Sequence, residues 1–167
     1  MGKFDGLLLC TDLDGTLLRN DKTISRENIE AIDYFKREGG HFTFVTGRMP
    51  FFVSYALNTV KPNAPFGCVN GAGLYDSAKK EYVWTANMPD NVITLVQYID
   101  DQFSDVGIQV NTFQRTYFCK ENQTMANFRK LTGLENIVCD YHNLQEPIAK
   151  ILFGSELDEE ILNIERH

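Results

Sequence analysis

The sequence predicts an α/β fold that is built on a parallel sheet. Residues 7–10 (LLLC) form a continuous apolar run, and a helical segment separates them from a second apolar strand over residues 41–46. The separation of 34 residues from Asp12 to Thr46 suits one strand–helix–strand unit with a right-handed crossover. A run without polar alternation is typical of a strand buried on both faces. We therefore expect residues 7–10 to lie inside the sheet.

The other elements of the first half have local sequence reasons. Ser25 is suited to cap a helix, because apolar residues follow it at helical spacing and Gly39-Gly40 ends the pattern. A second helix is expected over residues 51–60 and a third strand over 65–69. Residues 74–75 and 81–84, joined by a polar turn, predict a hairpin.

The pattern changes near residue 86, where we place a domain boundary between residues 1–86 and 87–167. The second part starts with a helix at residue 92. We expect strands over 107–119, 137–141 and 150–153, and helices over 121–130 and 158–166.

Composition and charge exclude several classes of protein. Hydrophobic residues are 43% and charged residues 23% of the 167-residue chain, which is the balance of a globular protein with a core. A net charge of −7 without a basic run predicts no nucleic-acid partner. No segment is apolar for long enough to predict a membrane partner. The four cysteines predict no zinc site, and we interpret them as small buried side chains in a reducing cytoplasm.

Two acidic residues directly follow the first strand. Asp12 and Asp14, here called the acidic pair, lie at the carboxyl end of that strand, where open α/β sheets bind ligands. Their spacing directs both side chains to one side and Leu13 to the core. Adjacent carboxylates repel each other, and Mg²⁺, which prefers oxygen ligands, would relieve this. An exposed acidic turn, an EF-hand loop and a phosphoacceptor site are alternatives that fit the surrounding pattern less well.

Three motifs resemble one family. Residues 12–16 (DLDGT) match the first motif of the haloacid dehalogenase-like (HAD) superfamily, and the longer run with residues 21–25 (DKTIS) is similar to its Cof-type phosphatase branch. Residues 44–48 (FVTGR) resemble the second motif of that branch and residues 69–72 (VNGA) its Asn-Gly-Ala segment. The resemblance implies a partial HAD-like parallel-sheet core over 1–86 and an inserted α+β cap domain, incomplete, over 87–167.

The resemblance also implies roles for the acidic pair. Asp12 would be the nucleophile that forms an aspartyl-phosphate, and Asp14 the general acid and base. Asp12, through its carboxylate, and Asp14, through its main-chain carbonyl, would hold Mg²⁺.

The remaining site residues are expected to bind phosphate. Thr46 and Gly47 would donate hydrogen bonds to phosphate oxygens, although Thr46 also suits a helix N-cap. Arg48 is either a substrate contact or a charge that ties its loop to nearby acids. Asn70 and Gly71 are expected at the same site, although Asn-Gly is also an ordinary turn pair.

Two further motifs of the family are not found after residue 86: a lysine that stabilises the aspartyl-phosphate, and an acidic Gly-Asp-x-x-Asn-Asp strand end. We therefore expect a chain truncated at its C-terminus. The function implied is Mg²⁺-dependent hydrolysis of small phosphorylated metabolites such as sugar phosphates, in the cytoplasm. The alternative is a non-catalytic relative that binds phosphate without turnover. The oligomeric state is not predicted.

Overall fold

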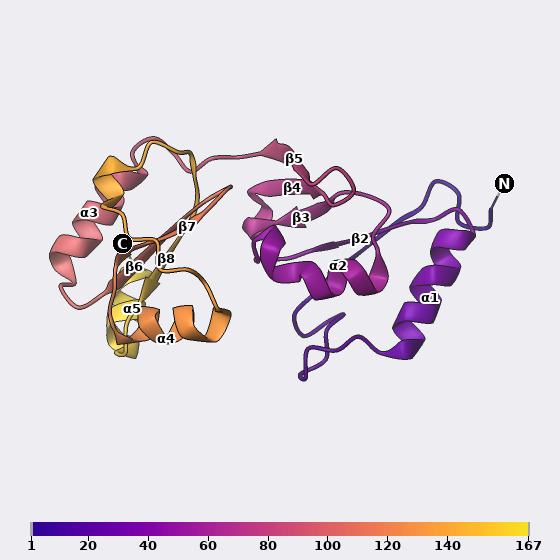
Figure 1. The fold of residues 1–167 in the computed structure, drawn as a ribbon, viewed down its shortest axis with the longest axis horizontal. Coiled ribbons are helices and arrows are strands. Elements are labelled where there is room, and N and C mark those ends of the chain that lie inside the picture. The colour runs from indigo at the N-terminus through magenta and orange to yellow at the C-terminus, as the bar shows by residue number, and fades with distance from the viewer. Residues whose placement is uncertain (1, 167) are drawn as a thin grey trace. The chain divides into compact units, whose positions relative to one another are not determined.

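The computed structural model describes residues 2–166, and the chain divides into two compact units, Met1–Ala86 and Asn87–His167 (Figure 1). The α/β prediction is confirmed. The first unit contains the strands β1 (Leu8–Asp12), β2 (His41–Val45), β3 (Phe66–Cys68), β4 (Gly73–Asp76) and β5 (Glu81–Thr85), and the helices α1 (Arg26–Arg37) and α2 (Ser54–Val60). A 3-10 turn, Pro50–Val53, precedes α2.

The first sheet has the order β1-β2-β3-β4-β5. Strands β1, β2 and β3 are parallel, with Asp12 opposite Val45 and Val45 opposite Gly67. The hairpin of β4 and β5 continues the sheet in antiparallel fashion. Because the first three strands run the same way, their carboxyl ends lie along one edge of the sheet. The loops that carry the predicted site residues all leave from that edge.

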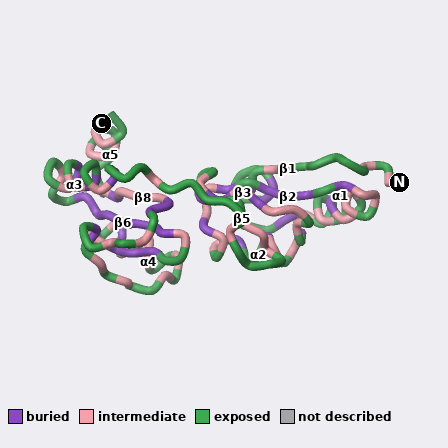
Figure 2. Tube along the Cα trace, turned by 90° about the horizontal axis from the view of Figure 1, so that it is seen from above, coloured by how far each residue is buried: buried purple, intermediate pink, exposed green. Residues whose placement is uncertain are grey.

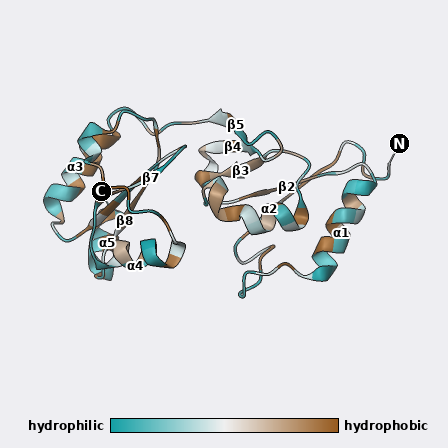
Figure 3. Ribbon diagram, in the orientation of Figure 1, coloured by the Kyte–Doolittle hydropathy of each residue, from teal (hydrophilic) through white to brown (hydrophobic). Residues whose placement is uncertain are grey.

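Helix α1 begins where the sequence predicts. The Ser25 hydroxyl accepts a hydrogen bond from the Asn28 amide at 3.1 Å, which satisfies one of the unpaired amides of the first turn. Ile32 is buried on the inner face of the helix, and Figure 3 shows hydrophilic and hydrophobic residues alternating along it. The helix packs on β2 and beside α2.

The core of the first unit is aromatic. Phe44 on β2 and Phe66 on β3 are both 0% exposed, and their ring centroids lie 4.8 Å apart. Phe42 and Leu13 are buried with them. Since β2 and β3 form the centre of the sheet, this packing fixes the strand ends from which the site loops leave.

The prediction that residues 7–10 are buried on both faces is wrong. Leu7, Leu8 and Leu9 are 54%, 61% and 46% exposed, and Cys10 is exposed as well. Figure 2 shows β1 in the colour of exposed residues beside a mostly buried β2. The physical reason is position: β1 is an edge strand, so within the described residues it has a strand neighbour on one side only.

The second unit is a small α/β layer structure. Its helices are α3 (Val92–Gln102), α4 (Gln123–Thr132) and α5 (Asp158–Ile164), and its strands are β6 (Gly107–Thr112), β7 (Thr116–Lys120) and β8 (Ile148–Gly154). The three strands form an antiparallel sheet of order β7-β6-β8. Residues of α3 and β6, among them Val96 and Val110, share a buried core with Tyr141. Among the described residues, no helix is long and apolar enough to span a membrane.

Two strand predictions in this unit are wrong. Residues 107–119 form not one strand but the hairpin of β6 and β7, because the chain turns at residues 113–115, where Thr112 Oγ1 accepts from the amides of Gln114 and Arg115. Residues 137–141 make only a single parallel bridge, Val138 to Phe118, before a 3-10 turn at Tyr141–Asn143.

Candidate active site

The acidic pair extends from β1 into a tight loop. Asp12 is the last residue of β1 and Asp14 lies just beyond it; both are exposed, whereas Leu13 between them is 0% exposed. The Leu13 carbonyl accepts a hydrogen bond from the Leu18 amide at 2.8 Å, which closes the loop. Gly15 has a φ of +76°, a conformation that a side chain would strain. The alternation predicted from the spacing of the two acids is therefore confirmed.

The second loop follows β2 and carries Thr46. Its side chain is buried, its amide donates to the Gly67 carbonyl at 3.0 Å, and its hydroxyl oxygen accepts from the Arg48 amide at 3.2 Å. The alternative of a helix N-cap is not what the structure has, because the next helical turn begins at Pro50 after Met49. Thr46 instead fixes the turn that presents Arg48.

The third loop follows β3 and is joined to the second. The Asn70 amide lies 3.4 Å from the Thr46 carbonyl, and the Val69 amide donates to the Arg48 carbonyl at 3.0 Å. A Cβ on Gly47 would lie 2.2 Å from Asn70 Oδ1, so the close approach of the two loops needs a glycine there. Val69 and Asn70 both have a φ of 55°, which is unfavourable for the β-branched valine and marks a strained turn, whereas Gly71 adopts its φ of +94° without a side-chain penalty.

Asp14 is held by two cations. Arg48 donates from Nε to Oδ2 at 2.8 Å and from Nη2 to Oδ1 at 2.6 Å, a bidentate pair. Lys22 Nζ donates to Oδ1 at 3.0 Å. The hydrogen bond from Arg48 above all, and that from Lys22, hold the pKa of the Asp14 carboxyl below its ordinary value against partial desolvation. The structure shows the contact by which Arg48 ties its loop to an acid, and the alternative of a substrate contact stays a prediction.

Replacing Arg48 with Gln should raise the pKa of Asp14 toward the ordinary value. In the wild-type protein, the contribution of this pair to stability is present above about pH 4, the ordinary aspartate pKa, and is lost as the pH falls through the lower folded-state value. Carboxyl ¹³C chemical shifts of Asp14, followed through an acid titration, measure the change. Lys22→Gln is the matched control and should give the smaller shift; an equal or larger shift would contradict the dominance of Arg48.

The oxygen donors at the end of β1 fit a magnesium ion whose remaining coordination positions are filled by water and substrate. Among residues 2–166, no side-chain hydrogen bond or ion pair holds the Asp12 carboxylate, and no cluster of three or more metal-binding side chains occurs. Arg48 and Lys22 occupy the Asp14 carboxylate, which leaves the main-chain carbonyl of Asp14 as a second donor. Magnesium commonly takes one or two protein oxygens and completes its shell with water and phosphate.

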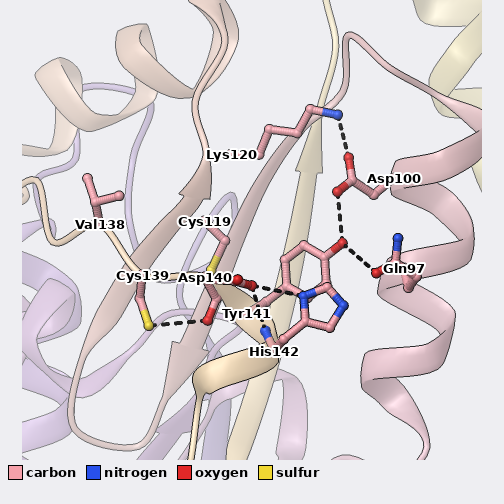
Figure 4. A pocket seen from close by; sticks show the side chains of 9 residues that line it. All are labelled: Gln97, Asp100, Cys119, Lys120, Val138, Cys139, Asp140, Tyr141 and His142. Atoms are coloured by element: carbon pink, nitrogen blue, oxygen red, sulfur yellow. Dashed lines mark hydrogen bonds and ion pairs between the residues drawn. The ribbon is translucent and has the colours of Figure 1, made fainter.

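Each of the two units contains a hollow. A small one of about 100 Å³ is lined by Lys22 and Arg48 on its polar side and by Leu13, Leu18 and the start of α2 on its apolar side. A larger one of about 510 Å³ lies wholly in the second unit, away from the acidic pair in sequence (Figure 4). Chemistry rather than volume points to the first unit, because Lys22 and Arg48, which line the smaller hollow, also hold the Asp14 carboxylate.

The larger hollow, here called the α3 pocket, has a charged lining. Figure 4 shows Lys120 paired with Asp100, whose other oxygen accepts from the Tyr141 hydroxyl at 2.8 Å. Burial opposes the charge of Asp100, but the bonds from Lys120 and Tyr141 lower its pKa. The ion pair between Lys120 and Asp100 is partly buried. The lining consists of Gln97, Asp100, Cys119, Lys120, Val138, Cys139, Asp140, Tyr141 and His142.

The structure thus brings the seven predicted site residues together at one sheet edge, within the first unit. Sequence reasoning missed Lys22 as a partner of Asp14, because a lysine in a polar turn carries no signal of its own. Its position inside the family-like run at residues 21–25 was the available sign. Cys68 is buried as expected, whereas Cys10 is exposed and Cys119 and Cys139 are only partly buried.

Known proteins that resemble this chain are hydrolases. A family model described as haloacid dehalogenase-like hydrolase matches residues 9–167. The 5-amino-6-(5-phospho-D-ribitylamino)uracil phosphatase YitU of Bacillus subtilis is 23% identical over 154 residues, which cover 91% of this chain and 57% of that protein. The pyridoxal phosphate phosphatase YbhA of Escherichia coli is 37% identical over 98 residues, 56% of this chain and 34% of that protein.

Solved structures share the fold. A haloacid dehalogenase-like hydrolase from Bacteroides thetaiotaomicron superposes with a TM-score of 0.75 at 17% identity, over 98% of this chain and 62% of the other. The aligned part of this chain therefore covers less than two thirds of the length of each of these three proteins.

Proposed function

Because the chain belongs to the haloacid dehalogenase-like hydrolase family, we propose that it contributes the nucleophile and the phosphate-binding loops of a phosphomonoester hydrolase. The observation that carries the proposal is the exposed Asp12 carboxylate at the same sheet edge as Thr46 and Arg48. Residues 1–86 are assigned to the catalytic core and residues 87–167 to a cap domain. The substrate class is a small phosphorylated metabolite, in keeping with the phosphatases YitU and YbhA among the relatives.

Asp12 is the nucleophile in this proposal. Its carboxylate oxygen attacks phosphorus in line, the ester oxygen leaves, and water then hydrolyses the aspartyl-phosphate. The carboxylate is suited to this because it is exposed and held by no side-chain partner in the described part of the chain. A bound magnesium, held by the Asp12 carboxylate and the Asp14 carbonyl, would supply charge neutralisation for the phosphoryl group.

Asp14 is the general acid and base in this proposal. Its ion pair with Arg48 determines whether the carboxyl can hold a proton. With Arg48 and Lys22 bound to it, Asp14 is held as a carboxylate, the form that accepts a proton from attacking water. To donate a proton to the leaving oxygen, Asp14 must first take one up from water, and loss of these partners favours that uptake because it raises the pKa of the carboxyl toward its ordinary value. An incoming phosphate dianion offers both cations another acceptor, so substrate binding itself favours this release.

The remaining loop residues bind phosphate. The Thr46 hydroxyl, which now accepts from the Arg48 amide, has its own hydrogen free to donate to a phosphate oxygen. Gly47 and Gly71 let backbone amides approach a ligand without side-chain obstruction. Asn70, held against Gly47, supplies an amide that orients the same oxygens.

The purified chain, tested with an aryl phosphate and a panel of sugar phosphates and pyridoxal phosphate, should release phosphate only when Mg²⁺ is present. Absence of turnover with every ester, in a protein whose folding has been verified by circular dichroism, would contradict the catalytic proposal. Stabilisation by phosphate with Mg²⁺ in a thermal melt, without turnover, would instead support the non-catalytic alternative of a phosphate-binding relative. The observation that favours that alternative is the pair of cations, Arg48 and Lys22, that occupies the Asp14 carboxylate.

A further inference from the structure

Two cysteines line one side of the α3 pocket in the second unit. Cys119 lies on β7 and Cys139 lies in the segment that runs along the outer edge of that strand. Figure 4 shows both thiols on the side of the pocket away from Asp100 and Gln97 of α3. Nineteen residues, including all of α4, lie between them in sequence, so their proximity is a product of the fold.

The backbone brings these cysteines side by side. Phe118 and Val138 form a parallel bridge, and the Phe118 amide donates to the Ile137 carbonyl at 2.9 Å. The residues that follow the two bridge partners are Cys119 and Cys139. Neighbouring strands lie about 4.8 Å apart, and disulfides span Cα separations of about 4.4–6.8 Å. At this bridge the two chains are therefore spaced within the range that a disulfide spans, and the cysteines are the next residue of each chain.

Both thiols are accessible to chemistry and free of strong bonds. Each cysteine is partly exposed and reduced in the structure. The Cys139 thiol makes only a 3.3 Å contact with the carbonyl of Asp140, a weak bond that rotation about the side chain can give up. Burial, aided by the negative charges of Cys139 and Asp140, raises the pKa of Cys119 to about 12. Cys139 is accordingly the thiol that reacts first.

We propose that Cys119 and Cys139 form a reversible disulfide that closes the wall of the α3 pocket. The co-reactant is a small-molecule disulfide such as oxidised glutathione. The Cys139 thiolate attacks one sulfur of the oxidant, forming a mixed disulfide and releasing one thiolate. Cys119 then loses its proton to water, which the loss of the Cys139 charge in the mixed disulfide favours, and the resulting thiolate attacks Sγ of Cys139 and expels the second thiolate. The protein loses two electrons and two protons, and the oxidant becomes two thiols.

The bond would act on the segment that supplies most of the pocket lining. Residues 137–142 are joined to β7 by the bridge at Val138, and they carry Asp140, Tyr141 and His142 into the pocket. A disulfide at residue 139 would fix this segment to the sheet and reduce its local opening. A reduced protein would keep the pocket wall free to move.

The test is peptide mapping of the full chain in a Cys10→Ser background, which removes the exposed thiol of β1. After incubation with oxidised glutathione, the intact protein should be lighter by about 2 Da, the mass of two hydrogens. Trypsin cleavage without reduction should give the peptides 116–120 and 131–150 as one disulfide-linked product, and reduction should separate the two peptides. Hydrogen exchange of residues 137–142 should slow in the oxidised form.

Cys119→Ser and Cys139→Ser must each abolish the mass loss, whereas Cys68→Ser, at a buried thiol in the other unit, must leave it unchanged. Recovery of both peptides as free thiols would overturn the proposal. So would a glutathione adduct on Cys139 that persists without forming the link, or a link that involves Cys68. Each readout is independent of phosphatase activity.

Discussion

Replacing Asp12 with Asn is expected to lower phosphate release by at least about a thousandfold, the scale of loss when a nucleophile is removed from a hydrolase. The amide keeps the shape of the side chain but cannot attack phosphorus as a carboxylate does. It also removes the charged donor proposed for magnesium, so the thermal stabilisation by Mg²⁺ should disappear. Initial rates with an aryl phosphate and melting curves with and without Mg²⁺ measure the two effects.

Asp90→Asn is the matched control, because Asp90 is exposed and lies in the second unit, where no part of the candidate site is located. This variant should keep both the activity and the stabilisation by Mg²⁺. Equal rates for Asp12→Asn and the wild-type protein would remove Asp12 from the mechanism. Loss of Mg²⁺ stabilisation with activity retained would separate the two roles and leave only the metal assignment standing.

Replacing Phe44 with Ala is expected to destabilise the first unit by about 3–5 kcal/mol, the usual cost of removing a buried aromatic ring. Phe44 is 0% exposed and packs on Phe66, so the substitution leaves a cavity beside the Phe66 ring, where side chains of β2 and β3 pack together. A loss of this size is a large share of the stability of a small domain. Urea unfolding, followed by the fluorescence of Trp84, measures it in the correct unit, because the single tryptophan lies on β5.

Phe51→Ala makes the same chemical change at a surface. Phe51 is 45% exposed, and its ring centroid lies 4.5 Å from that of its neighbour Phe52 in a tilted arrangement, so its loss should cost less than about 1 kcal/mol. A similar midpoint shift for both variants would show that the Phe44 ring is not a central packing element.

The site was predictable because its chemistry lies in short segments at strand ends. Asp12, Thr46 and Asn70 each follow an apolar strand, and parallel strands bring such positions to one edge without further information. The start of α1 was predictable for a similar reason, since Ser25 acts through a local hydrogen bond. Signals of this kind can be predicted because they depend on residues that lie close together in the sequence.

Features that depend on distant neighbours were not predictable. The leucines of β1 have the composition of a central strand, but burial depends on what lies on both sides, and β1 has β2 on one side only. The α3 pocket needs Asp100, Lys120 and Tyr141 from three separate segments. The turn within residues 107–119 is a local exception: Thr112 Oγ1 accepts from the amides of Gln114 and Arg115, but a β-branched threonine equally suits a strand and gives no turn signal in the sequence.

The contact between Gly47 and Asn70 links two positions in any variant of this chain. A side chain at position 47 would meet Asn70 Oδ1, whereas a shorter residue at position 70 would make room for it. Substitutions at these two positions should therefore be tolerated together more often than singly. A library that randomises both codons and is sorted for folded protein should return alanine at 47 mainly with small residues at 70. The residue at position 47 therefore limits which residues are tolerated at position 70, and the reverse, because of the close approach to Asn70 Oδ1.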